Sequence, residues 1–228
     1  MRKIITLLFV LGLATSAFGA TLCTSLAGTD VVNTPGFSCS LGPLTFSNFT
    51  ASQIGLGMAP SIYLATGPVG PGITTGMSGG WAELAFQTNF NSNIFAYRDI
   101  AFDFQVTGPV YAVQSWMGGS GARSLIESAC LDSTCSQDVG DVVLYVGPPG
   151  ISITQATTGL NPAGSATYYI KKDISLFGSI DTSGQIPVLH AATMSEFAQG
   201  FQTAIPEPAT FVLIGVGLLG LGLMRRRS

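Results

Sequence analysis

Twelve carboxylates and one histidine, His190, are the residues that could carry acid–base chemistry in this 228-residue chain. A Ser-His-Asp triad needs only one histidine, but no Gly-x-Ser-x-Gly turn marks a nucleophile, so we expect His190 to be a surface or loop residue. A glycosidase would need two carboxyl groups across a sugar bond, and Glu83 and Glu127 are the glutamates to test first. No motif singles out this pair, and we therefore expect a non-catalytic protein.

Three other carboxylates, Asp132, Asp138 and Asp141, gather with serines and a threonine in residues 132–141. Ca²⁺ takes oxygen ligands of this kind, although the segment does not follow the EF-hand pattern. Aspartate and serine are also common turn formers, so a solvated turn is the favoured interpretation and calcium the alternative. No other cofactor is expected.

Aromatic side chains carry a sugar-binding hypothesis, because their faces can stack on sugar rings. The candidates are Trp81, Trp116, Tyr63, Tyr97, Tyr111, Tyr145, Tyr168 and Tyr169. Core packing is the default role of such residues. A structural matrix protein, a lectin-like module that binds extracellular polysaccharide and, as the least favoured class, a glycan-active enzyme therefore remain open. Burial of the two tryptophans would count against the lectin-like module.

The amino terminus has the three parts of a secretory signal. Arg2 and Lys3 precede an apolar run over residues 4–14, and Ala17-Phe18-Gly19 supplies small residues for signal peptidase. A run of 11 residues is well below the ~20 that a membrane-spanning helix needs. We expect a signal peptide over residues 1–19, cleaved after Gly19.

The carboxyl terminus combines a short motif, an apolar segment and a basic end. Ile205, Pro206, Glu207 and Pro208 precede an apolar run over 209–224, followed by Arg225, Arg226 and Arg227. The prolines hold Glu207 in an extended conformation that a processing enzyme can accept. A helix over 209–224 would be about 24 Å long against a bilayer core of ~30 Å, so it suits a temporary stop-transfer element. The arginines predict that this end stays in the cytoplasm.

This tail, residues 204–228, closely resembles the PEP-CTERM sorting signal. The resemblance implies recognition by an exosortase-like membrane enzyme in Gram-negative bacteria that make exopolysaccharide. It also implies a precursor tethered to the inner membrane through the C-terminal helix. The mature protein would then reach the cell envelope or the extracellular matrix.

Export predicts that the four cysteines form disulfides. Three pairings are possible. The one that closes the shortest loops joins Cys23 with Cys39 and Cys130 with Cys135, and we favour it. A zinc site is the alternative, but the spacing lacks a CxxC element. A lipoprotein anchor at Cys23 is disfavoured because Leu22, not a small residue, precedes it.

Charge argues against nucleic acid as a partner. Five of the nine basic residues lie in the first 20 and last 20 residues, which leaves Arg98, Arg123, Lys171 and Lys172 against all 12 acidic residues. Such an acidic surface repels phosphate backbones.

Short apolar runs between glycine and proline clusters predict strands throughout residues 20–203, which form one domain. The clearest is Asp99–Val106, and Thr107-Gly108-Pro109 is expected to turn the chain into a hairpin partner at Val110–Trp116. Further strands are expected at 44–50, 61–65, 83–88, 142–146, 151–155 and 167–176. Residues 195–199 fit either a helical turn or a last strand. About eight strands without a helical layer predict an all-β, antiparallel β-sandwich that is jelly-roll-like, with a closed barrel as the alternative.

Overall fold

A computed structural model describes residues 21–55, 59–92, 96–147, 152–181 and 188–203. The signal peptide, the motif 205–208, the apolar helix 209–224 and the final arginines lie outside these residues. The side chains of 165, 179–181 and 188–190 are likewise not described, which includes that of His190. Within the described part of the chain, no helix is long and apolar enough to cross a membrane.

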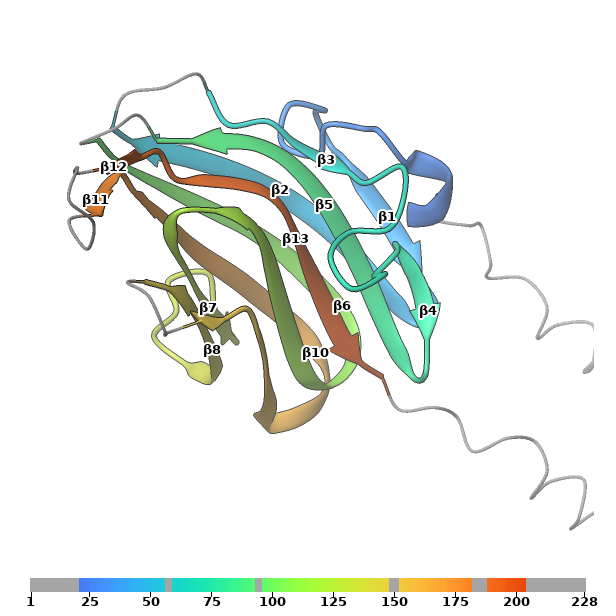
Figure 1. The fold of residues 1–228 in the computed structure, drawn as a ribbon. Coiled ribbons are helices and arrows are strands. Elements are labelled where there is room, and N and C mark those ends of the chain that lie inside the picture. Colours follow the sequence, from blue (N-terminus) through green and yellow to red (C-terminus); the bar gives the residue numbers. More distant parts are fainter. Residues whose placement is uncertain (1–20, 56–58, 93–95, 148–151, 182–187, 204–228) are drawn as a thin grey trace, which may run out of the picture.

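The described residues form strands joined by turns, with one short 3-10 helix, η1 (Cys23–Leu26). The strands are β1 (Ser38–Leu41), β2 (Leu44–Ile54), β3 (Ile62–Leu64), β4 (Gly76–Ser78), β5 (Trp81–Asn91), β6 (Tyr97–Ser120), β7 (Ala122–Cys130), β8 (Asp138–Val146), β9 (Ser152–Ile153), β10 (Gln155–Phe177), β11 (Ser179–Asp181), β12 (Val188–His190) and β13 (Thr193–Gln202). Figure 1 shows β6 and β10 curving across much of the molecule.

Eleven strands belong to one antiparallel sheet that folds over on itself, while β11 and β12 form a separate pair. The first half of β6 pairs with β2, its second half pairs with β13, and β10 follows it along both halves. One layer therefore contains β3, β4, β5, β13, the second half of β6 and the first half of β10. The other contains β1, β2, the first half of β6, the second half of β10, β7, β8 and β9. The expected antiparallel, jelly-roll-like sandwich is confirmed.

The predicted hairpin at Thr107-Gly108-Pro109 is wrong. The chain continues through these residues within β6, so Val110–Trp116 extends the strand and pairs with β10 and β13. Gly108 adopts a φ of 136°, a conformation that other residues rarely adopt, and an added Cβ there would lie 2.6 Å from the Pro43 carbonyl oxygen. Pro109 lies after the stretch that pairs with β2 and before the stretch that pairs with β13, so its missing N–H interrupts neither ladder.

The other predicted strands mostly extend further than expected. Residues 44–50, 83–88 and 142–146 lie within β2, β5 and β8, and 167–176 is the end of β10. Of the segment 151–155, Ser152–Ile153 form β9 and Gln155 begins β10. Residues 195–199 belong to strand β13 rather than to a helical turn.

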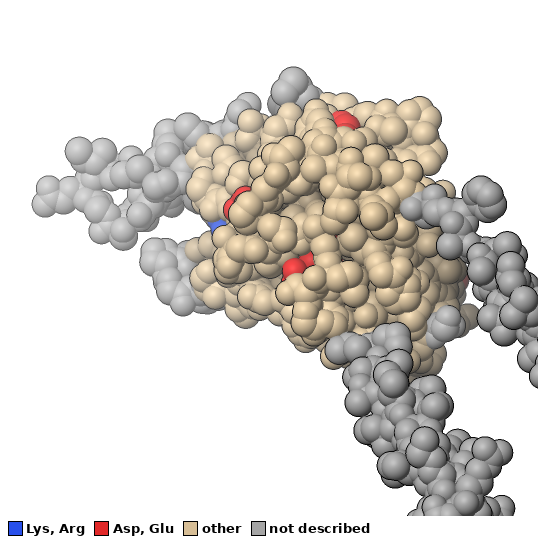
Figure 2. Space-filling view, turned by 90° about the vertical axis from the view of Figure 1, so that its right-hand side faces the viewer, with Lys and Arg blue, Asp and Glu red and all other residues tan. Residues whose placement is uncertain are grey.

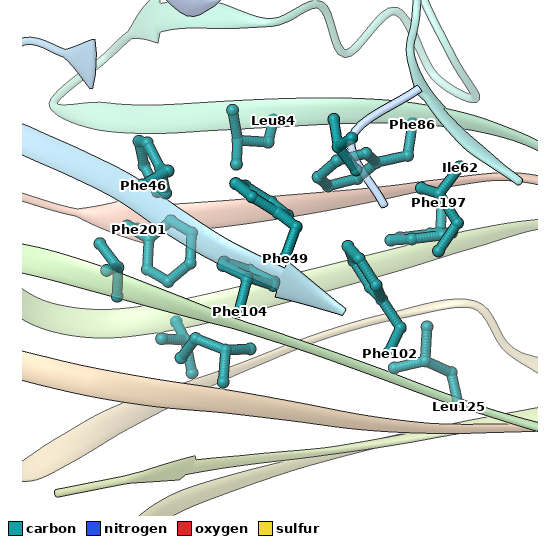
Figure 3. Packing of buried hydrophobic residues seen from close by; sticks show 14 of the residues in the cluster. Phe46, Phe49, Ile62, Leu84, Phe86, Phe102, Phe104, Leu125, Phe197 and Phe201 are labelled. Atoms are coloured by element: carbon teal, nitrogen blue, oxygen red, sulfur yellow. The ribbon is translucent and has the colours of Figure 1, made fainter. Parts of the chain in front are cut away.

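Aromatic side chains fill the space between the layers. Phe102 and Phe104 from β6 face Phe86, Phe197 and Phe201 from β5 and β13, as Figure 3 shows. Phe86 and Phe102 meet edge to face with ring centroids 5.6 Å apart, a favourable geometry for aromatic pairs. These residues are almost completely buried, and they follow the period-two alternation that places every second side chain on one face.

Two disulfides are present, and each joins cysteines that are close in the sequence, as expected. Cys23 in η1 is bonded to Cys39 in β1, and Cys130 at the end of β7 is bonded to Cys135 in the following loop. The first attaches the N-terminal segment to the sandwich. The second closes the turn between β7 and β8.

Candidate functional site

A groove crosses the outer face of the layer that contains β2, β6, β10 and β7. Its main hollow has a volume of about 450 Å³ and is lined by side chains from all four strands. Asp99, Asp103, Lys171 and Asp173 supply charged groups, and Ile126 supplies an apolar wall. Period-two alternation explains the arrangement, because each of these residues lies between buried neighbours on its own strand.

A second hollow of about 160 Å³ continues the groove. It shares Asp103 and Lys171 with the first and adds Asn48, Gln105 and Tyr169. The Lys171 Nζ and the Asp103 Oδ2 lie 3.6 Å apart and form a partly exposed ion pair where the two hollows meet. The groove is therefore elongated, open to solvent and rich in hydrogen-bonding groups.

Two carboxyl groups in the groove lie close to each other. Asp173 on β10 and Asp99 on β6 interact by a hydrogen bond, and the Ser175 hydroxyl donates to Asp173 at 3.4 Å. Desolvation, followed by the hydrogen bond with Asp99 and its charge repulsion, raises the pKa of Asp173 to about 6. The pair thus holds a proton more tightly than an isolated aspartate does.

Apolar side chains flank the groove on the same face. Direct cross-strand partners project to one side of a sheet, so Val143 lies beside Ile126, and Tyr97 lies beside Phe177. The Tyr97 and Phe177 rings are 5.3 Å apart, and Tyr97 is 47% exposed. This face holds six of the ten exposed large hydrophobic side chains among the described residues, namely Ile54, Tyr97, Ile126, Val143, Ile153 and Phe177.

The outer face of the opposite layer is covered instead. Residues 65–75 fold over it, and Val69 and Ile73 pack beside Trp116. Gly70 approaches the Trp116 ring so closely that an added Cβ would lie 2.2 Å from it. Trp81 and Trp116 are both partly buried. Trp116 is covered by its own chain, so its ring is not a free stacking surface.

The other predicted aromatic residues divide between the layers. Tyr97, Tyr145 and Tyr169 lie on the groove face, whereas Tyr63 projects from β3 in the opposite layer. Tyr168 is buried, and its hydroxyl donates to the carbonyl oxygens of Pro162 and Gly164. Tyr111 is exposed, and it lies opposite the register shift of β10 between Gly159 and Gly164.

The proposed calcium residues are not assembled into one site. The Asp132 carboxylate accepts hydrogen bonds from the backbone or hydroxyl groups of Thr134, Ser136 and Gln137, which hold the disulfide-closed turn. The hydrogen bond from the Thr134 hydroxyl is the main cause that lowers the pKa of Asp132. Asp138 and Asp141 interact with each other. In the described ranges, no group of three or more metal-binding side chains comes together.

The candidate glycosidase pair is separated by the sheet. Glu83 lies on the covered outer face of β5, where desolvation raises its pKa. Glu127 projects from β7 into the sandwich and is fully buried. These two carboxyl groups do not face one cleft.

Glu127 belongs instead to a core polar cluster that the sequence prediction missed, formed with Ser115, Lys172 and Gln199. All four side chains are buried between the layers and hydrogen-bond to one another. A signal was present in the sequence, because each is flanked at positions i−2 and i+2 by apolar residues of a strand: Val113 and Met117, Leu125 and Ala129, Ile170 and Ile174, and Phe197 and Phe201.

The described residues thus define a jelly-roll-like β-sandwich with one open, grooved face. The tail supplies the more specific classification, because residues 204–227 match the family model of the PEP-CTERM protein-sorting motif. This motif indicates an exported, envelope-directed protein, and it is associated with exosortase-type processing. The match covers the C-terminal end and not the sandwich.

Comparison of the whole chain yields no match among curated proteins. Among solved structures, the TmCBM61 module in complex with β-1,4-galactotriose is similar at 11% identity and a TM-score of 0.32, over 76% of this chain and 95% of that one. The enzymatically active domain of bacteriophage CBA120 tailspike protein 4 is similar at 13% identity and a TM-score of 0.34, over 67% of this chain and 18% of that one.

Proposed function

We propose that this protein is a non-catalytic, polysaccharide-binding component of the cell envelope or extracellular matrix. The observation that carries the proposal is the elongated groove, with its two hollows, on the open face of the sandwich. Two adjoining hollows in one groove suit a ligand that is itself an extended chain. Sugar hydroxyls can pair with the aspartates, Lys171 and amides that line the groove, while the apolar faces of sugar rings suit the flanking Tyr97 and Ile126.

The spacing of the carboxyl groups supports binding rather than hydrolysis. Glycosidases place their two carboxyl groups about 5–5.5 Å apart when they retain configuration and about 6.5–9.5 Å apart when they invert it. Asp99 and Asp173 interact directly by a hydrogen bond, so this pair is closer together than either class of glycosidase requires. A purely structural matrix protein is the second candidate, and it would show no saturable binding.

Binding should depend on the groove face and not on the opposite layer. Co-sedimentation with the exopolysaccharide of the source bacterium would be measured for the purified exported protein, with and without EDTA. Tyr97→Ala should weaken binding about tenfold, because an aromatic contact contributes roughly 1–1.5 kcal/mol. Tyr63→Ala is the matched control, since Tyr63 is similarly exposed at 39% but belongs to β3.

Equal loss of binding in both variants, or no saturable binding in the wild type, would contradict this function. If the wild type binds without EDTA and does not bind in its presence, Ca²⁺ would instead be implicated. Asp138 and Asp141 would then be the first carboxylates to replace, because they interact with each other, whereas Asp132 accepts five hydrogen bonds within its turn.

Sorting is proposed to proceed through a temporary membrane precursor. An exosortase-like enzyme would recognise Pro206-Glu207-Pro208 while the apolar segment 209–224 and the arginines hold the precursor at the inner membrane. Mass spectrometry of the mature C-terminus should show cleavage before Arg225 in the wild type. A variant with Glu207 and both prolines replaced by alanine should keep the arginines, and an intact C-terminus in both proteins would refute processing.

A further inference from the structure

The core polar cluster unites one cross-strand pair from each layer of the sandwich. Lys172 on β10 lies directly opposite Glu127 on β7, and Gln199 on β13 lies directly opposite Ser115 on β6. The two pairs face each other across the interior, where every one of the four side chains is at most 1% exposed. A buried ion pair is often no more stabilising than apolar residues of the same size, so stability alone does not account for this cluster.

We propose that Lys172 and Gln199 become joined by an amide bond between the Lys172 Nζ and the Gln199 Cδ, with release of ammonia. The product is a covalent cross-link between the two layers of the sandwich. Each group that such a reaction needs is present in the cluster and touches the reacting atoms.

Lys172 is placed to act as the nucleophile. Its Nζ donates hydrogen bonds to the Gln199 Oε1, to Glu127 and, at 3.0 Å, to the Ser115 Oγ. Burial lowers the pKa of Lys172, although the charge and the hydrogen bond of Glu127 oppose this effect. Proton transfer to Glu127 gives the neutral amine that can attack a carbonyl carbon.

Glu127 contacts both the nucleophile and the leaving group. Its Oε2 accepts from Lys172, and its Oε1 accepts from the Gln199 Nε2 at 2.8 Å. One carboxyl group can therefore take a proton from the amine and give a proton to the departing amide nitrogen. The Ser115 hydroxyl contacts both the Glu127 Oε2 and, at 2.8 Å, the Gln199 Oε1, and it can turn its one proton to the Gln199 oxygen as negative charge develops there.

The atoms and protons balance without a co-reactant. Starting from the ion pair, the Nζ–Cδ bond forms and the Cδ–Nε2 bond breaks, while the two protons that Nζ loses pass through Glu127 to the departing nitrogen, which leaves as the ammonium form of ammonia. Ammonia leaves, and Glu127 ends in its starting state. Exclusion of water protects the amide from the competing hydrolysis, and loss of ammonia makes the reverse reaction ineffective.

Gln199 is a better acceptor than Glu127 for two reasons. Its amide nitrogen can leave as ammonia once it is protonated, whereas a carboxylate has no comparable leaving group. A bond from Lys172 to Glu127 would also join two strands that are already hydrogen-bonded in the same layer. The bond to Gln199 connects β10 with β13, which are separated in the sheet by β6.

Peptide mapping of the mature, exported protein tests the proposal. Trypsin cuts after free lysine, and a glutamate-specific protease cuts after Glu196, between the two reacting residues. The wild type should give a peptide that begins at Lys172 joined to the peptide that contains Gln199, about 17 Da below their summed mass, as loss of ammonia requires. Cleavage after Lys172 should fall to a few per cent.

Two variants give the controls. Glu127→Gln removes the proton carrier, so its peptides should be separate, and Lys171→Arg should keep the cross-link because Lys171 faces the groove. Circular dichroism shows whether the Glu127→Gln variant is folded. If this variant does not fold, the peptide map of the wild type still shows whether the cross-link between Lys172 and Gln199 is present. Unlinked peptides in the wild type would overturn the proposal. So would a linkage between Lys172 and Glu127 with a loss of about 18 Da, the mass of water.

Discussion

Asp173→Asn should make the folded protein more stable at pH 8 and leave its stability nearly unchanged at pH 4. The pKa of Asp173 is raised from 3.8 to about 6 by desolvation and by Asp99. Below about pH 4 the carboxyl group is protonated in both the folded and unfolded states and contributes nothing. As the pH rises, the unfolded chain releases this proton first, so wild-type stability falls until the pH exceeds about 6.

The size of this effect follows from the pKa shift and the exposure of the group. Two pKa units correspond to an upper limit of about 3 kcal/mol, and solvent screening in an open groove reduces this to about 1 kcal/mol. For a folded unit of this size, that free energy corresponds to a shift in Tm of about 2–4 °C. Asparagine does not titrate and removes the repulsion, so it should recover this amount at pH 8.

Thermal unfolding from pH 4 to pH 8, followed by circular dichroism, measures the difference. Asp99→Asn should act in the same direction, because it removes the same repulsion. Asp103→Asn is the contrasting control, since Asp103 pairs with Lys171 and its loss should not stabilise the protein. Parallel pH profiles for the wild type and Asp173→Asn would show that the pKa of Asp173 is not raised in the folded protein.

Three further predictions concern the sandwich itself. Phe102→Ala should destabilise the fold by about 3–5 kcal/mol in denaturant unfolding, because it removes a fully buried aromatic ring, and a loss below 1 kcal/mol would contradict the packing. Gly70→Ala should displace the covering segment and shift the fluorescence of Trp116 to the red, because the added Cβ would lie 2.2 Å from its ring, and an unchanged spectrum would contradict that close approach. Replacing Cys23 and Cys39 with serine should lower the unfolding free energy by about 3 kcal/mol through loss of the loop closure, and equal stability would show that the disulfide does not constrain the unfolded chain.

Much of the fold was predictable because the alternation of apolar and polar residues along a strand indicates which side chains are buried. Ile100, Phe102 and Phe104 point inward along β6, as their spacing indicates. The predicted reversal at Gly108 is wrong because Gly-Pro is compatible both with a reversal and with a continuing strand. Only the pairing of β6 with β2, β10 and β13 distinguishes the two, and that pairing involves residues far apart in the sequence.

The candidate site was less predictable, since it depends on strand register. Asp99 and Asp173 are separated by 74 positions and meet only because β6 and β10 pair in one alignment. Lys172 and Gln199 meet only after the sheet has folded into two layers. A single sequence can indicate that a polar residue points inward, but not which other strand supplies its partner.

The most direct test of the binding account is nuclear magnetic resonance of the ¹⁵N-labelled exported protein during titration with fragments of the exopolysaccharide. We predict saturable shifts of the amides of Ala101, Ser128, Lys171 and Asp173, which line the groove. The amides around Tyr63 in β3, on the opposite layer, should not move. Shifts confined to β3 and β5, or no shifts at millimolar fragment, would contradict the account.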